Sequence, residues 1–179
     1  MADFAEWEWT CACCGKRQRG VPEVGYAAPD VARWAEGSDE ATVHLQSDDF
    51  CVIETADQTD YFIRCYMEVP VLGAPKPLGI GVWSSLSEQN FRRYYDSFDD
   101  DDQENLGGMF GFLSNQLPYY PDTTNLHLRV MPCDGRVRPL VFVDSHNADH
   151  PLYRDQQSGL DANRAAEVLP AFAPCEGSA

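Results

Sequence analysis

The sequence predicts an α+β fold, in which a mostly antiparallel β-sheet is covered by packed helices. Two observations carry this prediction. Segments with the alternation and composition of strands follow one another between residues 50 and 86 without a helical pattern between them. Helical patterns then appear once in the middle of the chain and again near its end, so strands and helices do not alternate regularly. A chain of 179 residues is predicted to form one domain, 1–179.

The first elements surround a cysteine-rich loop. In "FAEWEWTC", Trp7 and Trp9 alternate with glutamates, which indicates a strand that leads into the cysteines. "APDVARWAEG" is predicted to be a short helix, because Pro29 precedes its apolar residues and Gly37 closes it. Two strands around a polar turn are indicated by "FCVIETADQTDYFIRCYMEVPV". A further strand is indicated by "LGIGVWSSLS", in which the glycines leave one face with few side chains.

The clearest helix lies in "SSLSEQNFRRYYDSF". Its start is marked either by a capping box of Ser85 with Glu88 or by Ser87 as the N-cap. An aromatic stripe with the spacing of one helix face then predicts core packing; it consists of Phe91, Tyr94, Tyr95 and Phe98. The aspartates at 99–102 lack the ligand spacing of a calcium-binding loop and are predicted to be a solvated loop.

More strands and then helices complete the chain. "MFGFLSNQ", "LHLRVMP" and "RPLVFVD" have the character of strands, and "LPYYPDTTN" that of a turn. "HPLYRDQQSG" is rich in turn residues, and "LDANRAAEVLPAF" is predicted to be a helix capped by Asp161. Residues 170–179 are expected to form a loose C-terminal tail.

The formal net charge of −16 restricts the class of partner. Such a surface repels nucleic-acid phosphates and anionic lipid headgroups, which argues against both as partners. It favours divalent ions or a basic protein partner, unless it is simply the acidity common among cytosolic proteins. No apolar run approaches the roughly 18 residues needed to span a bilayer, and "MADFAEWEWT" lacks the features of a secretory signal. We therefore expect a cytoplasmic protein whose seven cysteines are reduced thiols or metal ligands.

The cysteine-rich loop, residues 10–20, contains half of a candidate zinc site. Cys11 and Cys14 have the C-x-x-C spacing of zinc knuckles and are followed by Gly15, which frees backbone amides to hydrogen-bond the thiolates. Cys13 is able to replace either ligand. A redox pair is the less favoured interpretation, because the segment that follows is too rich in glycine and proline to begin a helix.

The pair of strands after residue 50 offers further zinc ligands. If the turn between them centres on Gln58, Cys51 lies opposite Cys65 and Ile53 lies opposite Ile63. All four side chains would then share one face of the sheet. The two cysteines are candidates to complete a site with the N-terminal pair. Two buried thiols are the favoured alternative, because cysteine is among the most frequently buried residues.

A second group of candidate residues lies in "DSHNADHPLY". Asp144, His146 and His150 are candidate catalytic acid–base groups or metal ligands. The favoured alternative is a surface turn in which Asp and Asn side chains satisfy backbone amides. The sequence contains no nucleophile elbow, phosphate-binding loop, dinucleotide fingerprint or H-E-x-x-H motif, which lowers the odds of the corresponding enzyme classes.

Several segments taken together resemble one bacterial family, the domain-of-unknown-function family 2199. The matching segments span about residues 11 to 168: "CACCG", "SDDFCVI", "YFIRCYMEVPV", "GVWSSLSEQNFRRY", "FGFLSNQLPYYPDT", "VRPLVFVD" and "DHPLYRDQQSGL". The resemblance implies no mechanism, because the family is uncharacterised. It implies that five positions belong to the family pattern: Cys11, Cys14, Cys51, His150 and Gln156. Gln18 stands where the family often has a histidine, and glutamine is a poor zinc ligand.

Two classes of function fit these features. The favoured one is a non-enzymatic, acidic protein-binding or regulatory domain of the immunity or inhibitor type, with a structural zinc site. The alternative is a small metal-dependent or His/Asp-dependent enzyme that uses the Asp144–His150 cluster on a small molecule. Convergence of that cluster in a concave pocket would favour the enzyme. The binding protein is preferred because no nucleophile, base and oxyanion donor can be assembled from the sequence.

Overall fold

The computed structural model describes residues 8–10 and 15–172, except for the side chain of Trp9. The strands are β1 (Glu8–Thr10), β2 (Arg17–Arg19), β3 (Glu23–Gly25), β4 (Ala41–Gln46), β5 (Phe50–Thr55), β6 (Thr59–Val69), β7 (Leu78–Leu86), β8 (Met109–Leu113), β9 (His127–Met131) and β10 (Leu140–Val143). The α-helices are α1 (Asp30–Glu36), α2 (Glu88–Asp96), α3 (Pro151–Ser158) and α4 (Ala162–Val168). Short 3₁₀ helices are η1 (Gln103–Leu106), η2 (Ser145–Asn147) and η3 (Leu169–Phe172). The predicted α+β class is confirmed.

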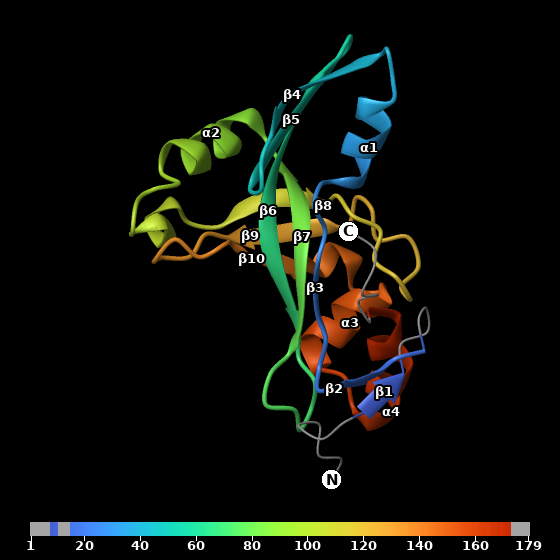
Figure 1. Cartoon of the computed structure of the whole chain (residues 1–179). Helices are drawn as coiled ribbons and strands as arrows, with labels where there is room; N and C mark the ends of the chain where they lie inside the picture. Colours follow the sequence, from blue (N-terminus) through green and yellow to red (C-terminus); the bar gives the residue numbers. More distant parts are fainter. Residues whose placement is uncertain (1–7, 11–14, 173–179) are drawn as a thin grey trace.

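The main sheet closes on itself. β6 and β7 form a long antiparallel hairpin that runs along most of the molecule (Figure 1). The sheet continues through β8, β9 and β10, and β10 returns to pair with β6, so these five strands form a closed ring. β5 and β4 extend the sheet from one end of β6, and β3 pairs with the other end of β7. Among the described strands, only the β10–β6 and β3–β7 pairs are parallel, as a mostly antiparallel sheet requires.

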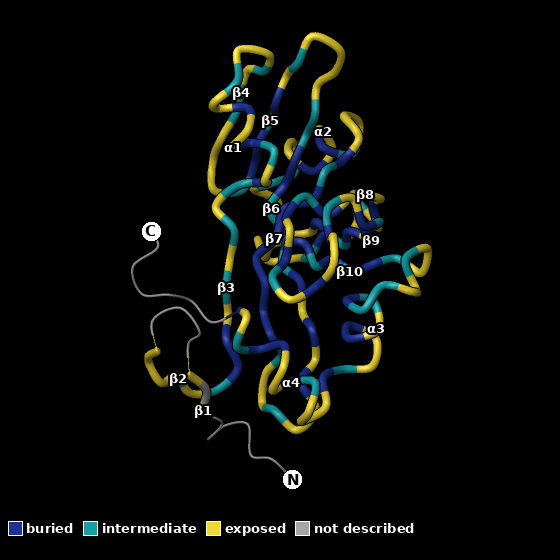
Figure 2. Tube along the Cα trace, turned by 90° about the vertical axis from the view of Figure 1, so that its right-hand side faces the viewer, coloured by how far each residue is buried: buried dark blue, intermediate teal, exposed yellow. Residues whose placement is uncertain are grey.

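Two apolar cores lie on the two faces of this sheet. The larger core fills the interior of the ring and extends under α2, α3 and α4. The smaller core lies under α1 and consists of Ala32, Ala35, Cys51, Ile53, Phe62 and Trp83. α1 and α2 accordingly cover opposite faces of the β5–β6–β7 region (Figure 1). β7 is buried along nearly its whole length, because both cores contact it (Figure 2). This burial explains why its sequence does not alternate.

Helix α2 begins at the second of its two candidate caps. The hydroxyl of Ser87 accepts a hydrogen bond from the amide of Asn90 at 3.3 Å, whereas Ser85 instead accepts one from the amide of Phe112. The predicted aromatic stripe packs as expected at Phe91 and Tyr94, whose rings are buried near Phe50. Core packing is wrong for Tyr95, which is 48% exposed because it lies at the edge of the buried face.

The predicted register of the β5–β6 hairpin is wrong. Cys51 pairs with Phe62, and Ile53 pairs with Asp60. An odd shift in register moves every side chain of a strand to the other face. Cys51 therefore lies in the core under α1, whereas Cys65 lies inside the ring. These two thiols are buried on opposite faces of the sheet and cannot complete one metal site.

The two ends of the chain fall partly outside the description. Cys11, Cys13 and Cys14 lie outside the described residues. Within residues 8–10 and 15–172, no group of three His, Cys, Asp or Glu side chains is placed to hold a metal ion.

The first three residues of the expected C-terminal tail, 170–172, instead belong to η3, and the ring of Phe172 is buried. In the same described part, no helix combines the length and apolar character required to cross a membrane.

Candidate functional site

An exposed group of aromatic rings lies on the outer surface of β8 and β9. Side chains alternate along β8, so Met109 and Leu113 point into the core while Phe110 and Phe112 point outward. Phe110 is 50% exposed and Phe112 is 36% exposed. The two phenyl rings pack edge to face at 4.9 Å, and the imidazole of His127 meets both of them edge-on.

A fourth ring comes from the segment after β10. The imidazole of His146 in η2 stacks on that of His127, with ring centres 4.1 Å apart and planes within 5°. Hydrogen bonds hold this segment against β9. The amide of Asp144 donates to the carbonyl of His127 at 2.8 Å, and the Asn147 side chain accepts from the amide of His127 at 2.9 Å. We call Phe110, Phe112, His127 and His146 the aromatic face.

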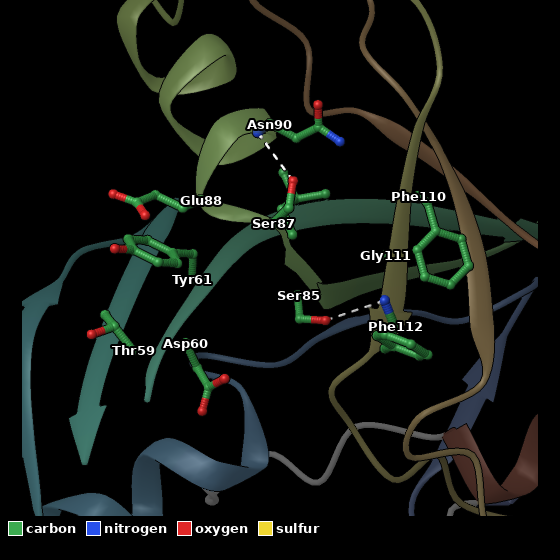
Figure 3. Close-up of a pocket in the computed structure, with 11 residues that line it drawn as sticks. Thr59, Asp60, Tyr61, Ser85, Ser87, Glu88, Asn90, Phe110, Gly111 and Phe112 are labelled. Carbon is green, nitrogen blue, oxygen red and sulfur yellow. Dashed lines mark hydrogen bonds between the residues drawn. The ribbon is translucent and has the colours of Figure 1, made fainter. Parts of the chain in front are cut away.

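A pocket of about 600 Å³ adjoins the aromatic face. Phe110 and Phe112 lie on one side of it, and Tyr61 with the beginning of α2 lies on the other (Figure 3). Its charged lining residues are Asp60 and Glu88, and no Lys or Arg of the described residues lines it, although Arg92 pairs with the carboxylate of Glu88 at 2.6 Å. Ligand sites of proteins typically have volumes of about 300–1,000 Å³. The pocket therefore has room for a small ligand or for side chains of a partner. Asp60, which accepts hydrogen bonds from Gln58 and forms no ion pair with a described Lys or Arg, supplies its negative charge.

A glycine allows β8 and β7 to approach closely beneath this surface. Gly111 lies between the two exposed phenylalanines, and a Cβ atom there would collide with the hydroxyl of Ser84 and the carbonyl of Ser85. The hydroxyl of Ser85 accepts a hydrogen bond from the amide of Phe112 at 3.2 Å, next to the pocket (Figure 3). The sequence "FGF" thus fixes both phenyl rings on one outward surface.

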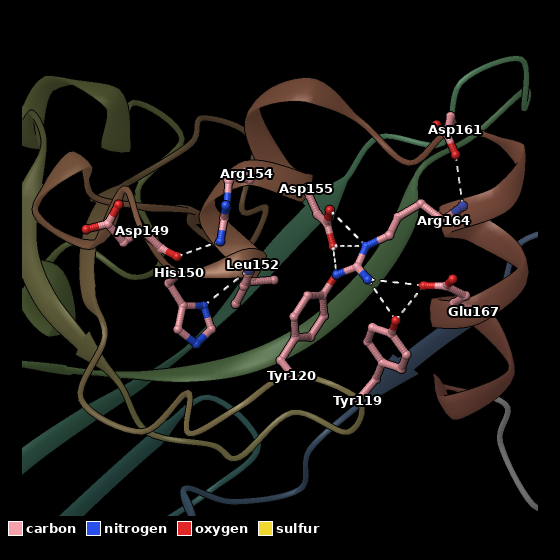
Figure 4. Close-up of polar contacts among 10 residues, drawn as sticks. All are labelled: Tyr119, Tyr120, Asp149, His150, Leu152, Arg154, Asp155, Asp161, Arg164 and Glu167. Atoms are coloured by element: carbon pink, nitrogen blue, oxygen red, sulfur yellow. Dashed lines mark hydrogen bonds and ion pairs between the residues drawn. The ribbon is translucent and has the colours of Figure 1, made fainter.

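The three catalytic candidates from the sequence do not meet in one pocket. Asp144 caps η2 by accepting a hydrogen bond from the amide of His146 at 2.9 Å. His146 belongs to the aromatic face. His150 caps α3, where its Nδ1 atom accepts a hydrogen bond from the amide of Leu152 at 3.1 Å (Figure 4). Asp144 therefore satisfies a backbone amide, as the turn interpretation expects. The turn-rich interpretation of "HPLYRDQQSG" is wrong, because His150 caps the helix α3 and Pro151 occupies its first turn, where no amide donor is needed.

A family model described as an uncharacterized protein conserved in bacteria, DUF2199, matches residues 10–160. The chain belongs to the DUF2199 family. The match includes all four residues of the aromatic face and both strands of the long hairpin. No curated protein and no solved structure shows a significant match to the chain.

Gln156, which the resemblance implied as a family position, has a structural role. Gln156 is buried in α3, where its Oε1 atom accepts from the amide of Val143 at 2.8 Å. Its Nε2 atom donates to the carbonyls of Val141 at 3.0 Å and Glu68 at 3.2 Å. One side chain thus bridges β10 and β6 at the seam where the ring closes.

Cys51, the described cysteine among the predicted metal ligands of the family resemblance, is a buried thiol. Cys51 has no exposed surface, and its burial, together with the nearby carboxylate of Glu36, raises its pKa to about 11. A metal ligand has to be a thiolate. The surroundings of Cys51 therefore favour packing over metal binding.

The sequence analysis missed Phe110, Phe112 and His127 as site residues. Both faces of β8 carry large apolar side chains, so alternation alone cannot show which face is exposed. β8 pairs with β7 and β9, the strands before and after it in the chain, but which face of β8 is covered depends on the closure of the ring by the distant β10–β6 pair.

Proposed function

We propose that this DUF2199 protein is a non-enzymatic binding protein that docks a basic protein partner on its aromatic face. The observation that carries the proposal is the continuous set of exposed rings on the outside of β8 and β9. Aromatic residues are enriched in the centres of protein interfaces, where they supply most of the binding energy. If docking covers the active or binding site of the partner, this protein would regulate the partner as an immunity protein or an inhibitor does.

Charge supports a basic partner in particular. The pocket beside the aromatic face contains Asp60 and Glu88, of which Glu88 is already paired with Arg92. A second hollow, which shares Asp60, Ser85 and Phe112 with this pocket, also contains Asp30. With a net charge of −16, the chain attracts cationic surfaces over long distances and repels polyanions.

The alternative class is an enzyme that uses Asp144, His146 or His150. Of these, His146 belongs to the aromatic face and Asp144 caps the same short helix. His150 is committed to the first turn of α3. Because the three groups do not converge on one pocket, the geometry supports docking better than acid–base catalysis.

The test is affinity capture from the source bacterium, followed by quantitative binding with the purified partner. The double variant Phe110→Ala, Phe112→Ala is expected to lower affinity by roughly 30-fold or more, the loss of at least one hot spot. Trp34→Ala is the matched control, because Trp34 is an equally exposed aromatic residue on α1. Affinity for wild type is expected to fall as salt is raised.

Two results would contradict the proposal. One is a partner that binds both variants as tightly as wild type. The other is failure to capture any basic protein at low salt, where electrostatic attraction is strongest.

A further inference from the structure

A second pocket, of about 460 Å³, lies where β6, the end of α2 and the segment before β10 meet. It shares no lining residue with the pocket of the aromatic face. Its lining residues combine aromatic, cationic, anionic and amide side chains: Glu23, Asp49, Tyr66, Tyr94, Phe98, Gln103, Arg136, Val137 and Arg138. We call it the arginine pocket.

One buried amide in the arginine pocket lacks a hydrogen-bond partner. Gln103 is only 1% exposed, and its Nε2 atom donates to the carbonyls of Ser97 and Phe98 at 2.8 and 3.1 Å. Its Oε1 atom is buried and has no partner among the described residues. A buried acceptor without a donor costs free energy. The pocket therefore offers an acceptor to a ligand that carries an N–H or O–H group.

Guanidinium groups supply donors at the same pocket. Arg138 donates from Nε to the carboxylate of Asp49 at 2.7 Å, and this is its only hydrogen bond to the described residues. Its Nη groups thus remain available to an acceptor. Arg136 has a backbone φ of 60°, in the left-handed region, and its Nε lies 3.3 Å from a carboxylate oxygen of Asp101.

A third arginine beside the pocket is also short of acceptors. Arg64 lies next to Tyr66 along the outer face of β6. Its Nη1 atom donates to the carbonyl of Asp48 at 3.4 Å, but its Nε atom is buried without a partner among the described residues. Burial and the nearby charge of Arg138 lower the pKa of Arg64. An anion bound at Arg138 would reduce this repulsion.

The remaining lining supplies negative charge and apolar walls. Asp49 and Glu23 are carboxylates, and Tyr94 and Phe98 are aromatic. Tyr66 fits above Gly79, where a Cβ atom would collide with its hydroxyl. The pocket thus places donors, acceptors and an apolar wall within one volume suited to a small molecule.

We propose that the arginine pocket binds a free α-amino acid with an apolar side chain. The carboxylate of the ligand pairs with Arg138 and Arg136. Its ammonium group donates to Gln103 Oε1 and to a carboxylate of the pocket, and its side chain packs on Tyr94 and Phe98. The proposal does not depend on the aromatic face.

Titration calorimetry with three matched probes tests it. L-Phenylalanine carries all three elements, 3-phenylpropionate lacks the ammonium group, and phenethylamine lacks the carboxylate. Loss of one charge-assisted group is expected to weaken binding by about tenfold or more, so only L-phenylalanine should bind well. L-Alanine is included as a smaller ligand. Binding of L-alanine but not of L-phenylalanine would show that the phenyl ring is too large, whereas binding of neither would show that the pocket does not accept the amino-acid headgroup.

Variants locate the binding. Arg138→Gln is expected to weaken L-phenylalanine binding by about tenfold or more, whereas Arg33→Gln, on α1, leaves it unchanged. Thermal unfolding verifies that both variants fold. The proposal is overturned if neither amino acid binds folded wild type at millimolar concentration. It is also overturned if 3-phenylpropionate binds as tightly as L-phenylalanine, or if Arg138→Gln has no effect.

Discussion

His150 shows how a residue with catalytic potential can serve the fold. Its Nδ1 atom accepts a hydrogen bond at the start of α3, so the imidazole acts as an N-cap. We expect His150→Ala to lower the free energy of unfolding by about 1 kcal/mol, whereas His150→Asn keeps a good cap and most of the stability. Urea denaturation measures both. Equal destabilisation by the two substitutions would contradict the capping role.

Cys51 is expected to make stability depend on pH. Burial and Glu36 raise the pKa of its thiol from 9.0 to about 11 in the folded chain. Between these values the unfolded thiol ionises while the folded thiol stays protonated, so the folded state binds more protons. The free energy of unfolding is therefore expected to fall as pH rises from 9 to 11. Above pH 11 the thiol is ionised in both states, so Cys51 causes no further fall.

The variant Cys51→Ala isolates this contribution. The alanine lowers stability at every pH by opening a cavity, but it removes the thiol that ionises. We expect the decline between pH 9 and pH 11 to be shallower in the variant than in wild type. Parallel slopes in chemical denaturation at these pH values would show that Cys51 does not carry the effect.

At the scale of elements, local patterns predicted more than long-range ones. The α2 helix follows from its aromatic spacing and its cap, which are both contained in a few residues. The register of β5 against β6 cannot be predicted in this way, because the turn at 56–58 sets it. A shift of one residue would move every side chain of a strand to the other face of the sheet. The zinc site at Cys11 and Cys14 stays a prediction. In Figures 1 and 2, the flanking strands β1 and β2 lie at the opposite end of the molecule from β5, which carries Cys51.

A polar cluster joins α3, α4 and the segment before β9. Arg164 forms hydrogen bonds with both carboxylate oxygens of Asp155, at 2.9 to 3.2 Å, and its guanidinium lies 4.9 Å from the ring centre of Tyr119. The hydroxyl of Tyr120 donates to Asp155 at 2.9 Å (Figure 4). Because Asp155 is largely buried, removing Arg164 leaves a carboxylate poorly compensated.

This cluster is expected to hold the helices in place. We expect Arg164→Met to lower the free energy of unfolding by about 2 kcal/mol or more and Tyr120→Phe to lower it by about 1 kcal/mol. A double-mutant cycle between the two, measured by denaturant unfolding, should show coupling because both residues contact Asp155. Strictly additive effects would contradict a shared cluster.

At the scale of the whole molecule, the closure of the sheet determines which surface is exposed. The parallel return of β10 to β6 joins segments more than 70 residues apart and has no local sequence signal. It leaves the outer surfaces of β8 and β9 uncovered, where the two phenylalanines lie. The sequence therefore predicted the fold class, whereas the position of the candidate site required the assembled sheet. The basic protein partner stays a prediction.

Photo-crosslinking tests the docking proposal most directly. A photoreactive phenylalanine analogue is placed at Phe112 in one variant and at Trp34 in the other, and both are irradiated in the source bacterium. The account predicts that a basic protein is crosslinked at Phe112 and not at Trp34, and that the crosslink weakens at high salt in extracts. Crosslinking at Trp34 alone, or no protein crosslinked at Phe112, would contradict the aromatic face as the docking surface.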